Sequence, residues 1–296
     1  MEAMESDKIG VVCPVENLSA ADSARMIRKA EELGYGAFWI GELVVGRDPF
    51  AMAAHLLGAT ARIKLGTCVA IVWKRQPATM MNAARTLAGL FDNRFILTMG
   101  TSHKPFINRY GMNYQQPYRF MREYVAKMKS APYLGPPLTR EPPVMIAALM
   151  PKMLELAAQT DGVMITNGTP ELTARVRAAV GPGKSVYVIQ KMLLETDAAK
   201  ARAVGRAMFN FYTRLPNYAN SIRTLGFSDE DLANGVSDRL VDALLAWGTE
   251  EKLHDALDAQ FKAGADHIVI LPLAVGDTAK GVPLIDQRTF EAMAPR

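Results

Sequence analysis

Two ionisable side chains directly follow strand-like segments of the sequence. Glu42 comes after the apolar run 36–40, and His103 comes after the apolar run 95–100. An imidazole titrates near neutral pH and can donate or accept a proton, and burial can raise the pKa of a carboxyl group until it acts as an acid. These residue types therefore indicate proton transfer. The alternative roles are a hydrogen-bonded structural group for Glu42 and a loop cap for His103.

The other positions that follow strand-like segments are mostly small or apolar. A site with few acids and bases is typical of an enzyme whose bound cofactor supplies the reactivity. No lysine is clearly buried at a strand end, where it could form a Schiff base, since the placement of Lys191 is ambiguous. The candidate positions are Gly41, Cys68, Val69, Ala70, Trp73, Gly100, Thr101, Ser102, Leu149, Met150, Thr166, Asn167 and Gly168.

The sequence lacks the spacings that several common catalytic sites need. No HExxH or HxxE pattern brings metal ligands together, so no metal site is expected. No GxSxG motif is present, and the turn CPVENLS (13–19) after the first strand lacks the glycines of a dinucleotide-binding loop. The two cysteines, Cys13 and Cys68, are too few for a disulfide framework or a cysteine metal cage.

Regular spacing of the strand-like runs predicts how these positions are held. The runs 9–13, 36–40, 63–69 and 95–100 lie roughly 27 to 30 residues apart, which is the length of one strand–helix unit. Helix start signals separate them: Ser19 as an N-cap, and Pro49 and Pro77 as first helical residues. The pattern therefore indicates a parallel sheet covered by helices.

The second half of the chain continues the pattern less regularly. It holds the expected helices 118–129, 151–159, 170–180 and 250–263 and the expected strands 143–149, 161–166, 185–193 and 267–272. Eight alternating strands and helices predict the α/β class, a single (β/α)8 TIM barrel that forms one domain over 1–296. A helical insertion, about 197–247, separates strands seven and eight, and its aromatic patch is expected to roof the barrel mouth.

Composition sets further limits on the function. The chain has 296 residues, 49% of them hydrophobic, which is typical of a packed globular protein. Lys and Arg number 34 against 30 Asp and Glu, and a net charge of +4 does not indicate a nucleic-acid partner. No segment reaches the ~18 uninterrupted apolar residues of a membrane helix, and the acidic opening MEAMESDKIG is unlike an export signal. We therefore expect a cytoplasmic enzyme with no membrane partner.

Several segments resemble the luciferase-like monooxygenase superfamily, and within it the probable coenzyme F420-dependent oxidoreductases. The resemblance covers nearly the whole chain, and it lies in the ordered set of segments rather than in one motif. The segments are AEELGYGAFWIGE, DPFAMAAHLLGATARIKLGTCVAIVW, QPATMMNAARTLAGLFDNRFILTMGTSHKP, KMLELAAQTDGVMI, LPNYANSIRTLGFSDEDL and SDRLVDALLAWGTEEKL.

The resemblance implies a deazaflavin, coenzyme F420, or a flavin such as FMN across the barrel mouth, and a small-molecule substrate. The ring would stack on a bulge in strand three formed by Cys68, Val69 and Ala70, with a non-proline cis peptide at Cys68–Val69. The alternative is an ordinary trans strand end. The resemblance also implies a homodimer.

Other positions receive roles from the same resemblance. Gly100, Thr101 and Ser102 would contact the ring, and His103 would stand where relatives place a proton donor. Trp73 would wall the ring or the substrate, or simply pack. The cofactor's phosphate would bind at two helix starts, where free N–H groups favour an anion. The residues at those two starts are Leu149, Met150, Thr166, Asn167 and Gly168. The alternative is simple helix capping by Thr169, which the sequence supports equally.

One departure from the pattern and three alternatives remain. Relatives often carry an Asp-His pair after strand two, where this chain has Glu42 and Leu43, which speaks against sugar-phosphate chemistry. The leading hypothesis is an F420-dependent oxidoreductase that transfers hydride to or from a small organic substrate. The alternatives are an FMN-dependent monooxygenase, a non-catalytic flavin-binding barrel and, least favoured, a metal or Schiff-base barrel.

Overall fold

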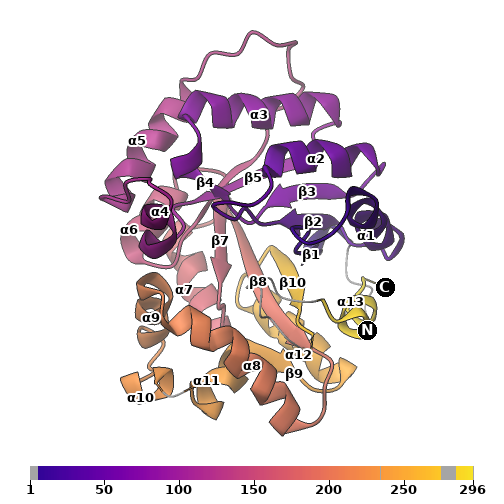
Figure 1. The fold of residues 1–296 in the computed structure, drawn as a ribbon, viewed down its shortest axis with the longest axis vertical. Coiled ribbons are helices and arrows are strands. Elements are labelled where there is room, and N and C mark those ends of the chain that lie inside the picture. The colour runs from indigo at the N-terminus through magenta and orange to yellow at the C-terminus, as the bar shows by residue number, and fades with distance from the viewer. Residues whose placement is uncertain (1–5, 234, 275–284, 296) are drawn as a thin grey trace.

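A closed barrel of parallel strands forms the centre of the molecule (Figure 1). The computed structural model describes residues 6–233, 235–274 and 285–295, so the first five residues of the acidic opening MEAMESDKIG lie outside the described residues. Eight strands follow the order β10-β1-β2-β3-β5-β6-β7-β8, and the barrel closes because β10 also pairs with β8. The predicted (β/α)8 barrel is confirmed.

The barrel strands are short and in parallel register. They are β1 (Ile9–Val12), β2 (Ala37–Ile40), β3 (Lys64–Thr67), β5 (Phe95–Gly100), β6 (Val144–Ala147), β7 (Gly162–Thr166), β8 (Ser185–Leu193) and β10 (His267–Pro272). Two shorter strands that the sequence did not predict, β4 (Ala70–Ile71) and β9 (Leu245–Trp247), extend the sheet beside β5 and β8.

Helices begin where the sequence predicted caps. Ser19 accepts a hydrogen bond from the Asp22 N–H at the start of α1, and Asp48 accepts from two N–H groups before Pro49 of α2. The helices that cover the barrel are α1 (Ala20–Glu32), α2 (Pro49–Gly58), α3 (Pro77–Leu90), α5 (Pro117–Lys129), α6 (Pro151–Ala157), α7 (Pro170–Val180) and α12 (Glu250–Lys262). Short helices α4 (Lys104–Arg109) and α13 (Gln287–Ala292) were not predicted.

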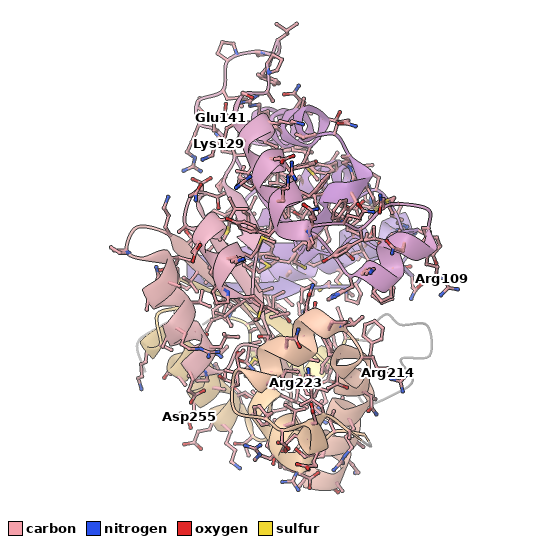
Figure 2. All side chains as sticks on the ribbon, turned by 90° about the vertical axis from the view of Figure 1, so that its left-hand side faces the viewer. Arg109, Lys129, Glu141, Arg214, Arg223 and Asp255 are labelled. Carbon is pink, nitrogen blue, oxygen red and sulfur yellow. The ribbon has the colours of Figure 1, made fainter. Side chains whose placement is uncertain are left out.

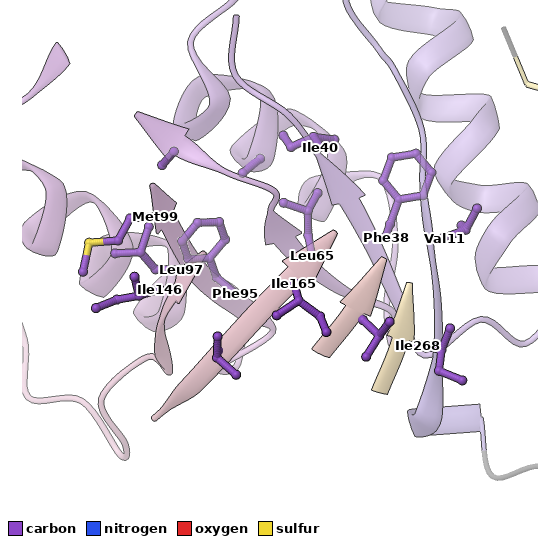
Figure 3. Packing of buried hydrophobic residues seen from close by; sticks show 14 of the residues in the cluster. Val11, Phe38, Ile40, Leu65, Phe95, Leu97, Met99, Ile146, Ile165 and Ile268 are labelled. Carbon is purple, nitrogen blue, oxygen red and sulfur yellow. The ribbon is translucent and has the colours of Figure 1, made fainter. Parts of the chain in front are cut away.

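The main core lies between the strands and the surrounding helices. Because side chains alternate along a strand, Phe38 and Ile40 of β2 point to the helices while Ala37 and Trp39 point into the barrel. Figure 3 shows Phe38, Leu65 and Phe95 in this outer layer. The same alternation runs along the other barrel strands, so their outward-facing and inward-facing side chains form two separate clusters.

Trp39 fills the lower part of the barrel interior, the end away from the strand C-termini. A Cβ on Gly66 would lie 2.1 Å from the Trp39 ring, and a Cβ on Gly10 would lie 2.7 Å from Trp39 Nε1. Only glycine leaves room for the indole at these two positions. The Trp39 N–H donates to His267 Nε2 at 3.3 Å, and His267 Nδ1 lies 2.9 Å from the Asp7 carbonyl oxygen. This end of the barrel is therefore closed and its polar atoms are paired.

The insertion between β8 and β10 packs at the other end, over the mouth. It comprises α8 (Ala198–Thr213), α9 (Pro216–Arg223), α10 (Asp229–Leu232), α11 (Asp238–Leu244) and β9. Its helices form their own apolar cluster with residues of β8 and β10. The predicted helical insertion is confirmed, with the correction that its last part is a strand. Among the described residues, none of the helices has the length and apolar character that crossing a membrane requires.

Candidate active site

A break in the third barrel strand marks the centre of the mouth. β3 ends at Thr67 and β4 begins at Ala70, and the peptide bond between Cys68 and Val69 is cis. The resemblance implied this bond, and the alternative of an ordinary trans strand end is wrong. β4 pairs with the end of β5, where a Cβ on Gly100 would lie 2.8 Å from Val69 Cγ2. The glycine therefore lets β5 approach the bulge closely.

Glu42 holds the segment that follows the bulge. Its side chain is fully buried and accepts from the Ile71 N–H at 2.7 Å. Its carboxylate also pairs with Lys74 Nζ at 2.8 Å and with an Arg75 terminal nitrogen at 2.7 Å. Arg75 in turn pairs with Asp48. These contacts favour the structural alternative for Glu42, and its catalytic role stays a prediction.

Trp73 packs rather than lying open at the mouth. Its ring stacks on Phe120 at a centroid distance of 3.9 Å and also contacts Tyr114. Its N–H donates to the Thr101 carbonyl oxygen at 2.7 Å, which fixes the start of the loop after β5. A direct role of Trp73 toward a substrate remains a prediction.

The loop after β5 turns sharply at Ser102. This residue has φ +54°, in the left-handed region that L-residues seldom adopt and that is found at many functional sites. The next residue, His103, occupies the N-cap position of α4, where its carbonyl oxygen accepts from the N–H groups of Phe106 and Ile107. Its side chain makes no capping bond, so the cap is made by the backbone and not by the imidazole.

Burial controls the charge of His103. Desolvation lowers the pKa of its imidazole to about 4, so the ring is neutral at pH 7. The expectation that it titrates near neutrality is therefore wrong. The ring meets that of Tyr218 edge-on at 4.6 Å, and its Nδ1 is buried without a hydrogen-bond partner. A neutral imidazole offers one nitrogen that accepts a hydrogen bond and one that donates.

The two helix starts that were expected to bind a phosphate differ in how deeply they are buried. Met150 is exposed at the start of the short helix α6, beside the half-buried Leu149. The turn before α7 is buried, with Asn167 at φ +56° and Thr169 capping the helix. We expected the missing side chain of Gly168 to let a phosphate approach, but a Cβ there would meet Val188 Cγ1 at 2.7 Å. Packing against β8 is the reason that this position needs glycine.

Lys191 is the site residue that the sequence interpretation missed. It is 1% exposed, near the end of β8, so the statement that no lysine is clearly buried at a strand end is wrong. Its Nζ donates to Asn167 Oδ1 at 2.7 Å and to Thr166 Oγ1 at 3.2 Å. Alternation along 185–193 was the available signal, because it places Lys191 on the same inward face as Tyr187 and Ile189.

Aromatic side chains of the insertion cover the mouth, as predicted. Tyr212 of α8 lies over Lys191, with 4.8 Å between Nζ and the ring centroid. Tyr212 also contacts Tyr218 of α9, and the Cys68 thiol is near enough to both to contribute to the raised pKa of each phenol. Phe211 stacks on Phe106 of α4. Figure 2 shows Arg109 of α4 and Arg214, which follows α8, on the same side of the molecule.

The structure therefore brings most of the predicted positions to one end of the barrel. The bulge, the loop after β5 and the turn after β7 all meet beneath α8 and α9. A pocket of about 290 Å³ opens beside the start of α7, lined by Thr169, Glu171, Arg175, Thr224, Leu225, Phe227 and Ala243. Over the described ranges, no three His, Cys, Asp or Glu side chains are grouped as a metal ion would require.

Comparisons with known proteins agree with this geometry. The family profile described as luciferase-like monooxygenase matches residues 7–267. A 5,10-methylenetetrahydromethanopterin reductase of Archaeoglobus fulgidus is 26% identical, covering 88% of this chain and 92% of that protein.

Two solved structures have a similar fold. An F420-dependent secondary alcohol dehydrogenase with an F420-acetone adduct superposes with a TM-score of 0.72 at 14% identity, covering 91% of this chain and 93% of that one. A type II Baeyer-Villiger monooxygenase of Pseudomonas putida in complex with FMN superposes with a TM-score of 0.68 at 12% identity, covering 97% of both chains. The chain belongs to the luciferase-like monooxygenase family.

Proposed function

We propose that this protein is an F420-dependent oxidoreductase that transfers hydride to or from a small organic substrate. The observation that carries the proposal is the bulge at Cys68–Val69 facing Gly100 at the barrel mouth, in a chain whose relatives include F420-dependent enzymes. A monooxygenase in complex with FMN also has a similar fold, so an FMN-dependent monooxygenase is the second candidate.

The residues at the mouth fit a tricyclic ring with a phosphate-bearing side chain. The bulge residues Val69 and Ala70 would support one face of the ring, and Thr101 and Ser102 would contact its edge. The buried turn before α7 would hold the phosphate through the N–H groups at that helix start, where the helix dipole favours an anion. The bound deazaflavin would supply the hydride-carrying carbon.

The chain's own residues would orient the reactants and exclude water. Tyr212 and Tyr218 close the mouth from above, and closure strengthens polar interactions within it. His103 would move the proton: its neutral ring accepts a hydrogen bond from a substrate hydroxyl or donates one to a carbonyl oxygen. Most of the rate enhancement would come from orientation. We further propose a cytoplasmic homodimer, with α2 and α3 as candidate interface helices.

Cofactor titration tests the proposal directly. Purified protein is titrated with F420 and, separately, with FMN, and the absorption and fluorescence of each ligand are followed. We expect saturable binding of F420 at least tenfold tighter than that of FMN. Tight binding of FMN without binding of F420 would instead favour the monooxygenase.

The role of His103 is tested with His103→Ala. We expect single-turnover hydride transfer to slow by 10²-fold or more, which is the usual contribution of a positioned proton-transfer group. Cofactor affinity should stay within a few fold. His55→Ala serves as the control, because the His55 ring lies on α2, outside the barrel, where its Nε2 is 2.9 Å from the Ala20 carbonyl oxygen. Unchanged hydride transfer in His103→Ala would leave this residue a packing role only.

A further inference from the structure

We propose that Lys191 and Asn167 bind a carboxylate group of the substrate inside the barrel mouth. The inference deepens the proposed function, on which its identification of a substrate rests. It concerns the side chains of Lys191 on β8 and of Asn167 in the turn before α7, whereas the proposed phosphate contact of that turn is made by its backbone N–H groups.

The position of Lys191 is that of a binding residue rather than of a surface cation. Strand alternation points its side chain into the barrel, together with Ile189 one layer below and Tyr187 two layers below. The side chain of Thr166 at the end of β7 meets the same amine. In closed parallel barrels, this end of the strands is where ligands bind.

Hydrogen-bond donors outnumber acceptors around Lys191 and Asn167. Lys191 Nζ donates to Asn167 Oδ1, which fixes the orientation of the amide because the reverse orientation would set two donors against each other. The amide nitrogen of Asn167 then has no partner, although the residue is only 1% exposed. An unpaired buried donor is destabilising, because it has lost its hydrogen bonds to water without replacing them. It is the kind of group that a ligand oxygen satisfies.

The amine also lacks a counter-charge. Both its oxygen partners are neutral, and the only other contacts recorded for its Nζ are the rings of Tyr212 and Phe209, among the residues that the structure describes. Desolvation lowers the pKa of Lys191 to about 7. The titratable groups around this region include the phenols of Tyr212 and Tyr218, the Cys68 thiol and the His103 imidazole, which meets the Tyr218 ring. Burial raises the pKa of the phenols and of the thiol and lowers that of the imidazole. All four are therefore neutral at pH 7 and supply no negative charge.

A carboxylate matches this arrangement better than a phosphate does. A carboxylate carries one charge over two oxygens, which suits one ammonium and one amide N–H. A phosphate dianion would need further cations to offset its greater desolvation cost. The rings of Tyr212 and Phe209 next to the amine suit an apolar or aromatic remainder of the same molecule. The Tyr212 ring must swing aside to admit it.

Calorimetric titration of the full-length, cofactor-free protein tests this site. The probes are benzoate, benzyl alcohol and inorganic phosphate, each measured between pH 6 and 9. The variants are Lys191→Met, and Asn167→Asp, which places a carboxylate beside the amine and tolerates the positive φ. The control is Lys184→Met, just before the start of β8 and at the opposite end from Lys191, where Nζ donates to the Thr160 carbonyl oxygen.

We expect wild type to bind benzoate at least tenfold more tightly than benzyl alcohol or phosphate. Both Lys191→Met and Asn167→Asp should lose at least tenfold in benzoate affinity, and Lys184→Met should keep it. Above the pKa of the free amine, the affinity should fall by about tenfold per pH unit, because the neutral amine no longer pairs with an anion. Circular dichroism establishes that each variant is folded.

Three results would overturn the proposal: equal binding of benzoate and benzyl alcohol, absence of benzoate binding, or unchanged benzoate affinity in Lys191→Met and Asn167→Asp. Tighter binding of phosphate would overturn the choice of a carboxylate. The F420 and FMN titrations are run separately on the same proteins. Benzoate binding without F420 binding would therefore refute the proposed cofactor alone, and F420 binding without benzoate binding would refute this site alone.

Discussion

The two ends of the barrel interior bury ionisable side chains in opposite ways. At the lower end, both ring nitrogens of His267 have partners, Trp39 Nε1 and the Asp7 carbonyl oxygen. Burial lowers the pKa of this ring to about 4, so it is neutral at pH 7. At the mouth, His103 leaves Nδ1 unpaired, and Asn167 leaves its amide nitrogen unpaired beside Lys191.

The difference separates structural from functional burial. Both histidines are neutral for the same reason, so the pKa by itself does not distinguish them. What distinguishes them is hydrogen bonding: folding alone satisfies the lower end, whereas the mouth keeps buried polar atoms that folding leaves without partners. We attribute those atoms to ligand binding, and the following predictions test that division, from the largest expected effect to the smallest.

Removing the Trp39 ring, which fills the lower end of the barrel, should cause the largest loss of stability. Trp39→Ala leaves a large cavity between Gly10 and Gly66 and should lower the free energy of unfolding by about 3–5 kcal/mol, measured by urea denaturation. Trp247→Ala on β9, whose side chain is only partly buried, is the control and should cost clearly less. Equal losses would mean that the lower end is no more tightly packed than the insertion.

Glu42→Gln tests whether a buried carboxylate near the mouth is structural. Removing its charge leaves the partly buried Lys74 without its anion and Arg75 with Asp48 alone, and we expect a loss of about 3 kcal/mol in unfolding free energy. Glu141→Gln removes a similar partner from Arg85, but the Glu141 side chain is 58% exposed, so that loss should stay below about 1 kcal/mol. Full stability with abolished turnover would instead make Glu42 catalytic.

Lys191 should make stability depend on pH. Its pKa is about 7 in the folded protein and lies near 10.5 in the unfolded chain, so the unfolded state binds more protons between these values. The free energy of unfolding should therefore gain a contribution from Lys191 as the pH rises from 7 to 9.5. Lys191→Met should lack that gain and be more stable than wild type at pH 7. Parallel pH profiles of the two proteins would contradict the burial of an uncompensated amine.

Gly168→Ala should have the smallest effect. Its Cβ would lie 2.7 Å from Cγ1 of the buried, β-branched Val188, which must shift to make room, and we expect a loss of about 1 kcal/mol in unfolding free energy. Gly41→Ala is the matched control, because the nearest atom to that Cβ is 3.7 Å away. A large loss of cofactor affinity without a loss of stability would mean that Gly168 does face the phosphate.

The sequence by itself determined the barrel fold and the end of the barrel at which the site lies. Alternation of strands and helices, prolines at helix starts and capping residues such as Ser19 and Asp48 are local signals, and each survived in the structure. Because every strand of a closed parallel barrel ends at the same rim, locating the strand ends also located Cys68, His103 and Asn167. The sequence did not predict the short elements β4, α4, β9 and α13, because these depend on contacts with segments that are distant in the chain.

Only the tertiary structure decided what each site residue contacts. Asn167 and Lys191 are 24 residues apart, and Glu42 and Arg75 are 33 apart, so no local pattern could show that they are partners. Charge followed from the same contacts: burial keeps His103 neutral and lowers the pKa of Lys191, although both side chains titrate normally in the isolated residue. Desolvation is a property of the assembled barrel, and for that reason the chemistry of the mouth could not be read from residue types alone.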